Sequence, residues 1–285
     1  HARPPRPPPR RALAALAYGA MSVCSVFLNK GLLKVYRFDY PGIIVLGQTA
    51  FTVVAIFSLR AARLVSQPPL NAAHLRRVLT LSALFLLKLI LDMYALSHVS
   101  IPMYGVLKSS TTPMVMLLDW VLRGKLAPAR VQAAVWLMTV GGVVAGAGDL
   151  AFSLVGYALA ISSAACTAAY VVVVGKLGED LQIDSFTLLL YNSLWSLPMS
   201  AGVVIATGEL GAAASFPHAG SRGFQASLLS SCASAFLLNL ATYYCTLVND
   251  SLTTSVVGRT KSVVQGAAGL VAFNDAGWSW LNLGG

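Results

Sequence analysis

Nine stretches of mostly apolar residues, each near the length needed to cross a bilayer, run along this chain. A membrane-spanning helix needs about 20 such residues. Only 11% of the 285 residues are charged, whereas soluble domains carry about 25%. The sequence therefore predicts an all-α polytopic membrane protein. The stretches are Ala12–Leu33, Pro41–Ala61, Val78–Leu96, Ile101–Leu122, Val131–Ala147, Phe152–Val174, Ser185–Ala206, Ala226–Val248 and Ser251–Phe273, and a tenth, truncated helix is expected from Trp278.

The basic residues of the connections lie mostly on one side of the predicted membrane. Lys and Arg are enriched in cytoplasmic loops, so the N-terminus is predicted to be cytosolic. The net charge of +10 is then explained by topology rather than by nucleic-acid binding. Residues 1–11 are expected to form a disordered cytosolic arm, and residues 12–285 a single transmembrane domain. One side holds Arg3, Arg6, Arg10, Arg11, Arg60, Arg63, Arg76, Arg77, Arg123, Lys125 and Arg130, and the other holds Lys34, Arg37 and Arg222.

The two halves of the chain show weak internal similarity. When Ser100 is aligned with Ser251, Lys108 falls on Arg259. The first and sixth stretches each carry a lysine near their C-terminal ends, Lys30 and Lys176. These correspondences predict a five-plus-five duplication, with repeats at about 12–149 and 150–285. Because five is odd, the second repeat would be inverted in the membrane, as in many secondary transporters that bind their substrate between repeats.

Several basic residues lie inside the apolar stretches, where each costs about 2.5–3.5 kcal/mol at a helix centre. Lys88 has a candidate partner in Asp92, four residues on. Lysines near helix ends can extend to the interface, which is the simpler interpretation of Lys30 and Lys176. The others, which have no acid one turn away, could pair with a remote acid such as Asp119 or bind an anionic ligand. They are Lys108, Arg259 and Lys261.

A diphosphate suits such a cluster, because its charge offsets the desolvation of the cations and Arg can bind two of its oxygens. Gly258, next to Arg259, would let a ligand approach the backbone. The Tyr191-Asn192 pair could hold a flat heterocycle, with Tyr104 lining the same cavity, or it could be a polar clamp between helices.

Motifs of hydrolases, metalloproteases and nucleotide-hydrolysing P-loops are absent from the sequence, so we expect no enzyme activity and no bound cofactor. The four cysteines lie in apolar stretches without metal-ligand spacing. A non-transporting membrane scaffold, whose cations contact lipid headgroups or partner proteins, is the remaining alternative of a different class.

Three motifs together resemble the nucleotide-sugar transporter family, part of the drug/metabolite transporter superfamily. They are Phe27-Leu28-Asn29-Lys30, Tyr191-Asn192, and the run from Leu252 to Ser262 that contains Gly258-Arg259-Thr260-Lys261. The resemblance implies a ten-helix Golgi or endoplasmic-reticulum antiporter that imports a nucleotide sugar and returns the nucleoside monophosphate. It also implies that Tyr191 and Asn192 contact the nucleobase and ribose, and that Gly258, Arg259 and Lys261 contact the sugar and diphosphate.

Two departures from related patterns bear on the substrate. GDP-mannose carriers show Phe-Tyr-Asn-Asn and Gly-Ala-Leu-Asn-Lys, whereas here Ser193 follows the single Asn192 and Lys261 is shifted by one residue. The pattern is closer to the branch that carries UDP-sugars. Plastid phosphate translocators usually have an adjacent Lys-Arg pair, so exchange of triose phosphate or another organic phosphate is the second choice. The expected partners are the nucleotide sugar, the nucleoside monophosphate and the lipid bilayer, and a homodimer stays open.

Overall fold

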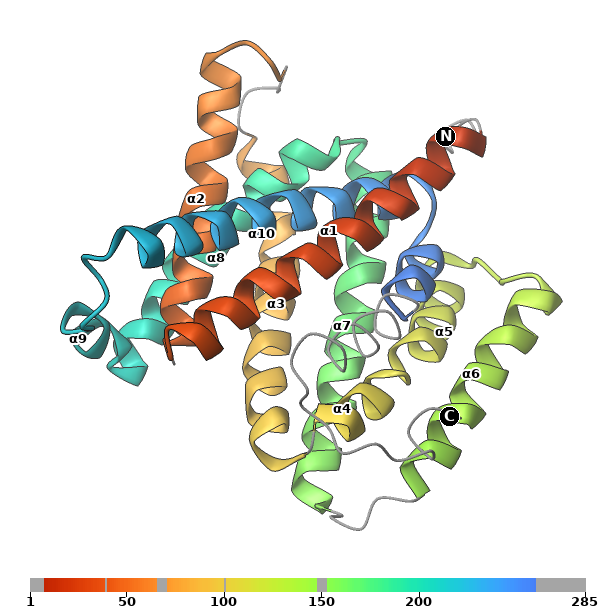
Figure 1. The fold of residues 1–285 in the computed structure, drawn as a ribbon. Coiled ribbons are helices and arrows are strands. Elements are labelled where there is room, and N and C mark those ends of the chain that lie inside the picture. The colour runs from red at the N-terminus through yellow and green to blue at the C-terminus, as the bar shows by residue number, and fades with distance from the viewer. Residues whose placement is uncertain (1–7, 39, 66–70, 100, 148–152, 260–285) are drawn as a thin grey trace. The chain divides into compact units, whose positions relative to one another are not determined.

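The structure is a computed structural model that describes residues 8–38, 40–65, 71–99, 101–147 and 153–259 (Figure 1). Within these ranges the chain is helical and contains no strand. A further helical segment covers residues 251–259. The labelled helices are α1 (Pro8–Val35), α2 (Pro41–Ala61), α3 (Ala72–His98), α4 (Ile101–Lys108), α5 (Thr111–Arg123), α6 (Ala129–Ala147), α7 (Leu154–Leu181), α8 (Ser185–Thr207), α9 (Glu209–Ala214) and α10 (Arg222–Val248).

Of the ninth predicted stretch, Ser251–Phe273, only residues 251–259 lie within the described ranges. The other eight apolar stretches correspond to these helices, with one exception. The fourth stretch is divided into α4 and α5 at Ser109 and Ser110. Pro113 explains the division, because it has no N–H to donate to the carbonyl of Ser109 and is best tolerated in the first turn of a helix. Within the described ranges, five helices are long and apolar enough to cross a membrane by length and composition: α1, α2, α7, α8 and α10. The ten-helix inverted repeat stays a prediction, and residues 278–285 lie outside the described ranges.

The chain divides into two compact units. Unit 1 contains His1–Ala83 and Leu177–Val248, and unit 2 contains Leu84–Lys176 and Asn249–Gly285. Each unit thus combines residues from both halves of the sequence. The proposed repeats at about 12–149 and 150–285 are not separate units by this division, although a structural relation between them is a different question and stays a prediction.

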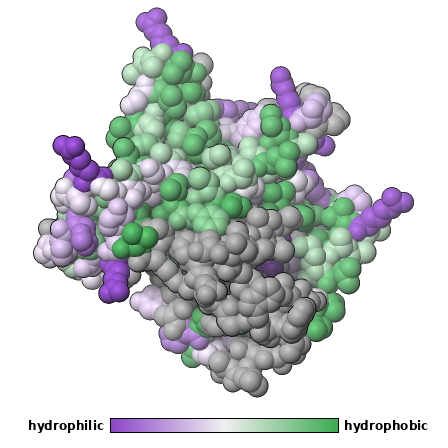
Figure 2. Space-filling view, viewed as in Figure 1, coloured by the Kyte–Doolittle hydropathy of each residue, from purple (hydrophilic) through white to green (hydrophobic). Residues whose placement is uncertain are grey.

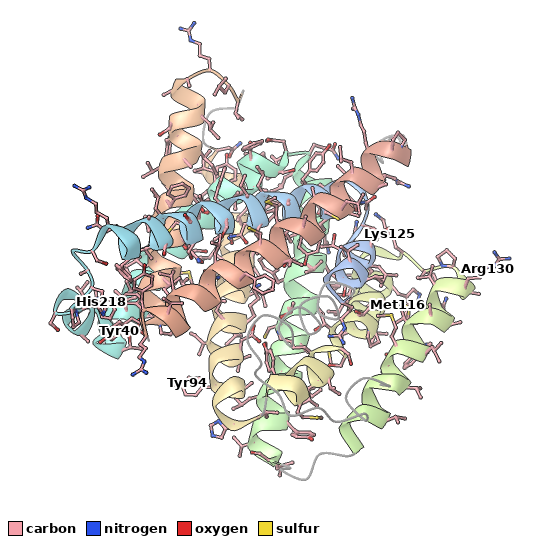
Figure 3. The ribbon with its side chains drawn as sticks, in the orientation of Figure 1. Tyr40, Tyr94, Met116, Lys125, Arg130 and His218 are labelled. Carbon is pink, nitrogen blue, oxygen red and sulfur yellow. The ribbon has the colours of Figure 1, made fainter. Side chains whose placement is uncertain are left out.

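In unit 1, α1 lies along α10, and α2 packs against α8 and α10 (Figure 1). A buried apolar cluster of Leu32, Phe38, Ile44 and Phe224 joins the ends of α1, α2 and α10. Aromatic rings surround this cluster, including those of Tyr40 and His218, which are labelled in Figure 3, and of Tyr36 and Phe216. Their edge-to-face geometry is the favoured arrangement for aromatic pairs.

The N-terminus of α2 is capped from a distance within unit 1. Its Pro41 has no N–H, and the N–H of Ile43 donates to Glu209 Oε2 at 3.0 Å. A carboxylate at a helix N-terminus satisfies an otherwise unpaired donor and is attracted by the helix dipole. The short helix α9, which the sequence did not predict, supplies this carboxylate.

In unit 2, α6 packs against α4 and α5. Val115, Ala168 and Val172 form a buried cluster between α5 and α7, with Leu252 packed against it. The hydroxyl groups of Thr112 and Ser255 lie 3.0 Å apart, which ties α5 to the helical segment 251–259. These contacts place α3, α4, α7 and segment 251–259 of unit 2 around the polar groups described below.

The helix surfaces are largely apolar. Figure 2 shows hydrophobic side chains over much of the helix surface and strongly hydrophilic ones at projecting ends. Helix α6 exposes Trp136, Leu137, Val140 and Val144 along one side. Such surfaces are costly in water and suit a lipid environment.

Candidate functional site

A polar network in unit 2 centres on Asp92 of α3. Its Oδ1 atom lies 2.8 Å from Lys108 Nζ and accepts a hydrogen bond from the Tyr104 hydroxyl at 2.5 Å. The hydroxyl of Ser163 on α7 donates to the same oxygen. Asp92 therefore joins α3, α4 and α7 through one carboxylate oxygen.

Lys108 is fully coordinated in this network. Besides Asp92, its Nζ donates to Ser163 Oγ at 2.7 Å and to Thr167 Oγ1 at 2.9 Å. The three protons of an ammonium group are thus matched by three acceptors. An anion that binds Lys108 must displace part of this network.

The pairing of Asp92 corrects a sequence-based prediction. The helical spacing predicted an ion pair between Lys88 and Asp92, but Asp92 pairs with Lys108 instead. Asp119 was a candidate partner for a remote cation, and it pairs with Arg123 one turn away, at 2.8 Å. Sequence spacing on one helix could not anticipate that α4 would bring Lys108 to α3.

Lys88 lies against aromatic rings instead. Its Nζ is 5.3 Å from the centroid of Phe85 on α3 and 4.6 Å from the centroid of Tyr170 on α7. Both distances fall within the range of about 6 Å over which a ring face attracts a cation. Among the described residues, no carboxylate lies within ion-pair distance of this ammonium group.

Arg259 ends the described part of segment 251–259. One terminal nitrogen, Nη1, donates to the carbonyl of Gly105 on α4 at 3.1 Å. Its Nε is buried and has no hydrogen-bond partner. Within the described ranges, Arg259 forms no ion pair. A guanidinium group has five N–H donors, and the structure assigns one of them an acceptor among the described residues. Gly258 precedes it on the same helix and is partly buried.

The start of segment 251–259 is fixed by polar contacts within unit 2. Asp250 accepts a hydrogen bond from the N–H of Thr253 at 2.5 Å, which caps the helix. Arg123 of the buried Arg123–Asp119 pair also donates to Ser251 Oγ at 2.8 Å. The Arg259 guanidinium is therefore carried on a helix whose N-terminal end is held firmly.

Tyr191 and Asn192 lie in unit 1, in the first half of α8, and both side chains are buried. The Tyr191 hydroxyl accepts a hydrogen bond from the N–H of Asn71 at 2.9 Å. Asn192 Oδ1 accepts one from the Ser82 hydroxyl at 3.0 Å. This arrangement fits the interpretation of the pair as a clamp between α8 and α3, and a contact with a nucleobase stays a prediction.

The remaining predicted residues are partly or wholly outside the description. Lys30 lies within α1, but its side chain is outside the described part of the structure. Lys261 lies outside the described residues. The structure thus brings together Tyr104, Lys108 and Arg259 on or against α4, and it adds Asp92, which the sequence had assigned to Lys88. Among the described residues, no group of three potential metal ligands is present.

Similarity to known proteins supports a transport role. The family model described as "Triose-phosphate Transporter family" matches residues 11–283 of the chain. The chain belongs to this family. The Triose-phosphate Transporter family match covers α2 to α10 in full and α1 from Arg11 onward.

Relatives of the chain are named as transporters. UDP-sugar transporter sqv-7 of Caenorhabditis elegans is 31% identical over 277 residues, which cover 96% of this chain and 84% of that protein. UDP-galactose/UDP-glucose transporter 7 of Arabidopsis thaliana is 32% identical over 282 residues, with 96% and 84% coverage. Nucleotide sugar transporter SLC35D2 of Homo sapiens is 30% identical over 275 residues, with 96% and 82% coverage. The resemblance to nucleotide-sugar transporters of the UDP-sugar branch is thereby confirmed.

The fold is also found in a solved structure. A protein crystal structure matches with a TM-score of 0.69 at 13% identity, covering 96% of this chain and 91% of that chain. This similarity concerns the fold alone. The five membrane-length helices among the described residues and the relatives named as transporters support a multi-pass membrane protein.

Proposed function

We propose that the chain is an antiporter that moves a nucleotide sugar, UDP-linked, from the cytosol into the Golgi or endoplasmic-reticulum lumen in exchange for the nucleoside monophosphate. Three named relatives that carry nucleotide sugars or UDP-sugars support the substrate class. The single observation that carries the proposal is Arg259, a guanidinium group inside a predicted membrane stretch without an acidic partner among the described residues.

Arg259 has the chemistry to bind phosphate. Its guanidinium can donate two parallel hydrogen bonds to phosphoryl oxygens, and such charge-assisted bonds are about twice as strong as neutral ones. The partner seen in the structure, the Gly105 carbonyl, uses one donor and leaves the charge uncompensated. A phosphate group would offset the cost of burying this charge and provide acceptors for the unused donors, including the buried Nε.

The other predicted residues have supporting roles in this proposal. Lys108 and Tyr104 extend the polar surface of α4 next to Gly105, with Lys261 following Arg259 on the chain. Gly258 allows close approach of the ligand. For unit 1, the sequence motif predicts that Tyr191 and Asn192 contact the uridine in place of their bonds to Asn71 and Ser82.

Transport would follow the alternating-access scheme of inverted-repeat carriers, in which the ligand site opens to each side in turn. No covalent step is needed, because release on the far side depends only on exchange of one phosphorylated ligand for another.

The proposal is tested with purified protein in liposomes. Uptake of radiolabelled UDP-sugars is measured in liposomes preloaded with UMP and in empty ones. We expect faster uptake in the preloaded liposomes, and equal rates would refute antiport. Arg259→Met should reduce the initial rate by about tenfold or more, because charged hydrogen bonds contribute about 1.5–3 kcal/mol. Arg130→Met is the matched control, since Arg130 is exposed at the start of α6 (Figure 3) and should transport normally.

A second candidate is exchange of smaller organic phosphates, which the description of the matching family favours. The same cations would serve this substrate, because both ligands present phosphate oxygens. Competition separates the two functions. If triose phosphate blocks uptake and UMP does not, the nucleotide-sugar proposal is refuted and the organic-phosphate function is supported.

A further inference from the structure

Lys88 lies inside the predicted membrane stretch Val78–Leu96, and the proposed function does not yet use it. It lies on α3 ten residues before its last residue, His98, about 15 Å along the helix axis, and farther from Ala72 at the other end. Both ends lie beyond the reach of a lysine side chain, so contact with lipid headgroups does not explain its charge. Its depth calls for a partner inside the protein or in a ligand.

Two aromatic rings contact the ammonium group of Lys88, and the charge of Asp92, which forms its ion pair with Lys108, also acts on it. Phe85 and Tyr170 present their rings at 5.3 and 4.6 Å, and the two ring centroids lie 5.9 Å apart. Ring faces attract a cation by about 0.5–2 kcal/mol but leave its charge in place. A ring face is not a conventional acceptor, so it does not satisfy the hydrogen-bonding capacity of the three ammonium protons. Donors on Lys88 Nζ therefore remain for an oxygen ligand.

Two carboxylates of unit 2 form ion pairs with cations other than Lys88 and Arg259. Asp92 is neutralised by Lys108, and Asp119 by Arg123. In the described parts of the membrane stretches of this unit, Lys88, Arg259 and Lys176 have no carboxylate within ion-pair distance. Lys176 lies near the C-terminal end of α7, where its side chain can extend to the interface, so Lys88 and Arg259 are the two deeper positive charges that remain. A nucleotide sugar carries one negative charge on each of its two phosphates. A phosphate monoester carries about −1.5 to −2 at pH 7.

We propose that Lys88, held by Phe85 and Tyr170, is a second phosphate-binding cation of unit 2 and pairs with a ligand that carries two negative charges. This inference rests on the proposed function, because the ligand is the same nucleotide class. The inference adds that both exchanged ligands, the nucleotide sugar and the nucleoside monophosphate, compensate the positive charges of Lys88 and Arg259. A compact ammonium group binds a phosphoryl oxygen as a point charge, without the fixed geometry that Arg requires.

The first test is the affinity of purified protein for UMP and for uridine, measured by calorimetry on the full chain. Lys88→Met should weaken UMP binding by tenfold or more and leave uridine binding unchanged. Lys88→Arg, which keeps the charge, should bind UMP within about threefold of the unsubstituted protein. The control, Lys125→Met, changes an exposed loop lysine and should not alter either affinity. Unchanged UMP affinity in folded Lys88→Met protein, or equal losses for UMP and uridine, would overturn the inference.

A second measurement needs no variant and covers the case in which Lys88→Met does not fold. Lysine acylation is followed by mass spectrometry in the unsubstituted protein with UMP, with uridine, or without ligand. UMP should reduce acylation of Lys88 and uridine should not. UMP binding without protection of Lys88 refutes this inference alone. Absence of UMP and UDP-sugar binding refutes the proposed function, and the inference with it.

Discussion

The pair formed by Asp92 and Lys108 offers a sharp quantitative test of the unit 2 network. Asp92→Asn keeps the shape of the side chain but leaves the Lys108 ammonium without a counter-charge. Breaking a buried ion pair from one side costs about 3–5 kcal/mol. The two side chains keep 16% and 25% of their surface exposed, so we expect a loss of stability near the lower limit, about 3 kcal/mol. Lys108→Met should reduce stability by about as much, because it leaves the Asp92 carboxylate without its cation.

The decisive quantity is the coupling between the two substitutions. In the double variant Asp92→Asn/Lys108→Met no charge is stranded, so its loss should be at least about 2 kcal/mol smaller than the sum of the single losses. Unfolding is followed by tryptophan fluorescence in detergent with increasing denaturant. Lys125→Met, an exposed charge removal, should stay within about 0.5 kcal/mol of the parent. Additive losses in the cycle would show that the pair does not stabilise the network.

Two further predictions concern helix packing and the role of α8. Gly178→Ala would place a methyl group 2.0 Å from Leu247 Cδ2 and should cost about 1–3 kcal/mol, whereas Gly202→Ala meets no atom within 4 Å and should be neutral or stabilising in the same unfolding assay. Ser82→Ala and Asn192→Ala should each cost about 1 kcal/mol, because they break the same bond between helices. Only Asn192→Ala should also weaken UDP-sugar binding by calorimetry, and equal affinities in both variants would restrict Asn192 to a clamp.

The positions of the membrane helices follow from apolar length, which the sequence displays directly. The boundaries of α2 coincide with the predicted stretch because Pro41 begins it and Arg60 lies in its last turn. The division between α4 and α5 was not predicted, although Pro113 is a residue type that interrupts helices. A proline four residues after Ser109 leaves that carbonyl without its helical donor, and the Ser109 and Ser110 hydroxyls bond back to the carbonyls of Val106 and Leu107.

The candidate site was predictable in its residue types but not in its pairing. Arg259 and Lys108 stand out because intramembrane cations are rare. The partner of Asp92, by contrast, depends on how α4 packs against α3, and spacing along one helix favoured Lys88. Likewise, the aromatic rings near Lys88 come from α3 and α7, which are far apart in the sequence. Pairings across helices depend on tertiary packing, which one sequence does not encode in any local pattern.

The central claim is that Arg259 binds the phosphate groups of the transported ligand. The most direct measurement is the dissociation constant of UMP and of uridine for the unsubstituted protein and for Arg259→Met. We expect the substitution to weaken UMP binding by about tenfold or more, in line with about 1.5–3 kcal/mol for a charged hydrogen bond, and to leave uridine binding unchanged. A UMP dissociation constant that is the same in both proteins would show that Arg259 does not bind the phosphate group.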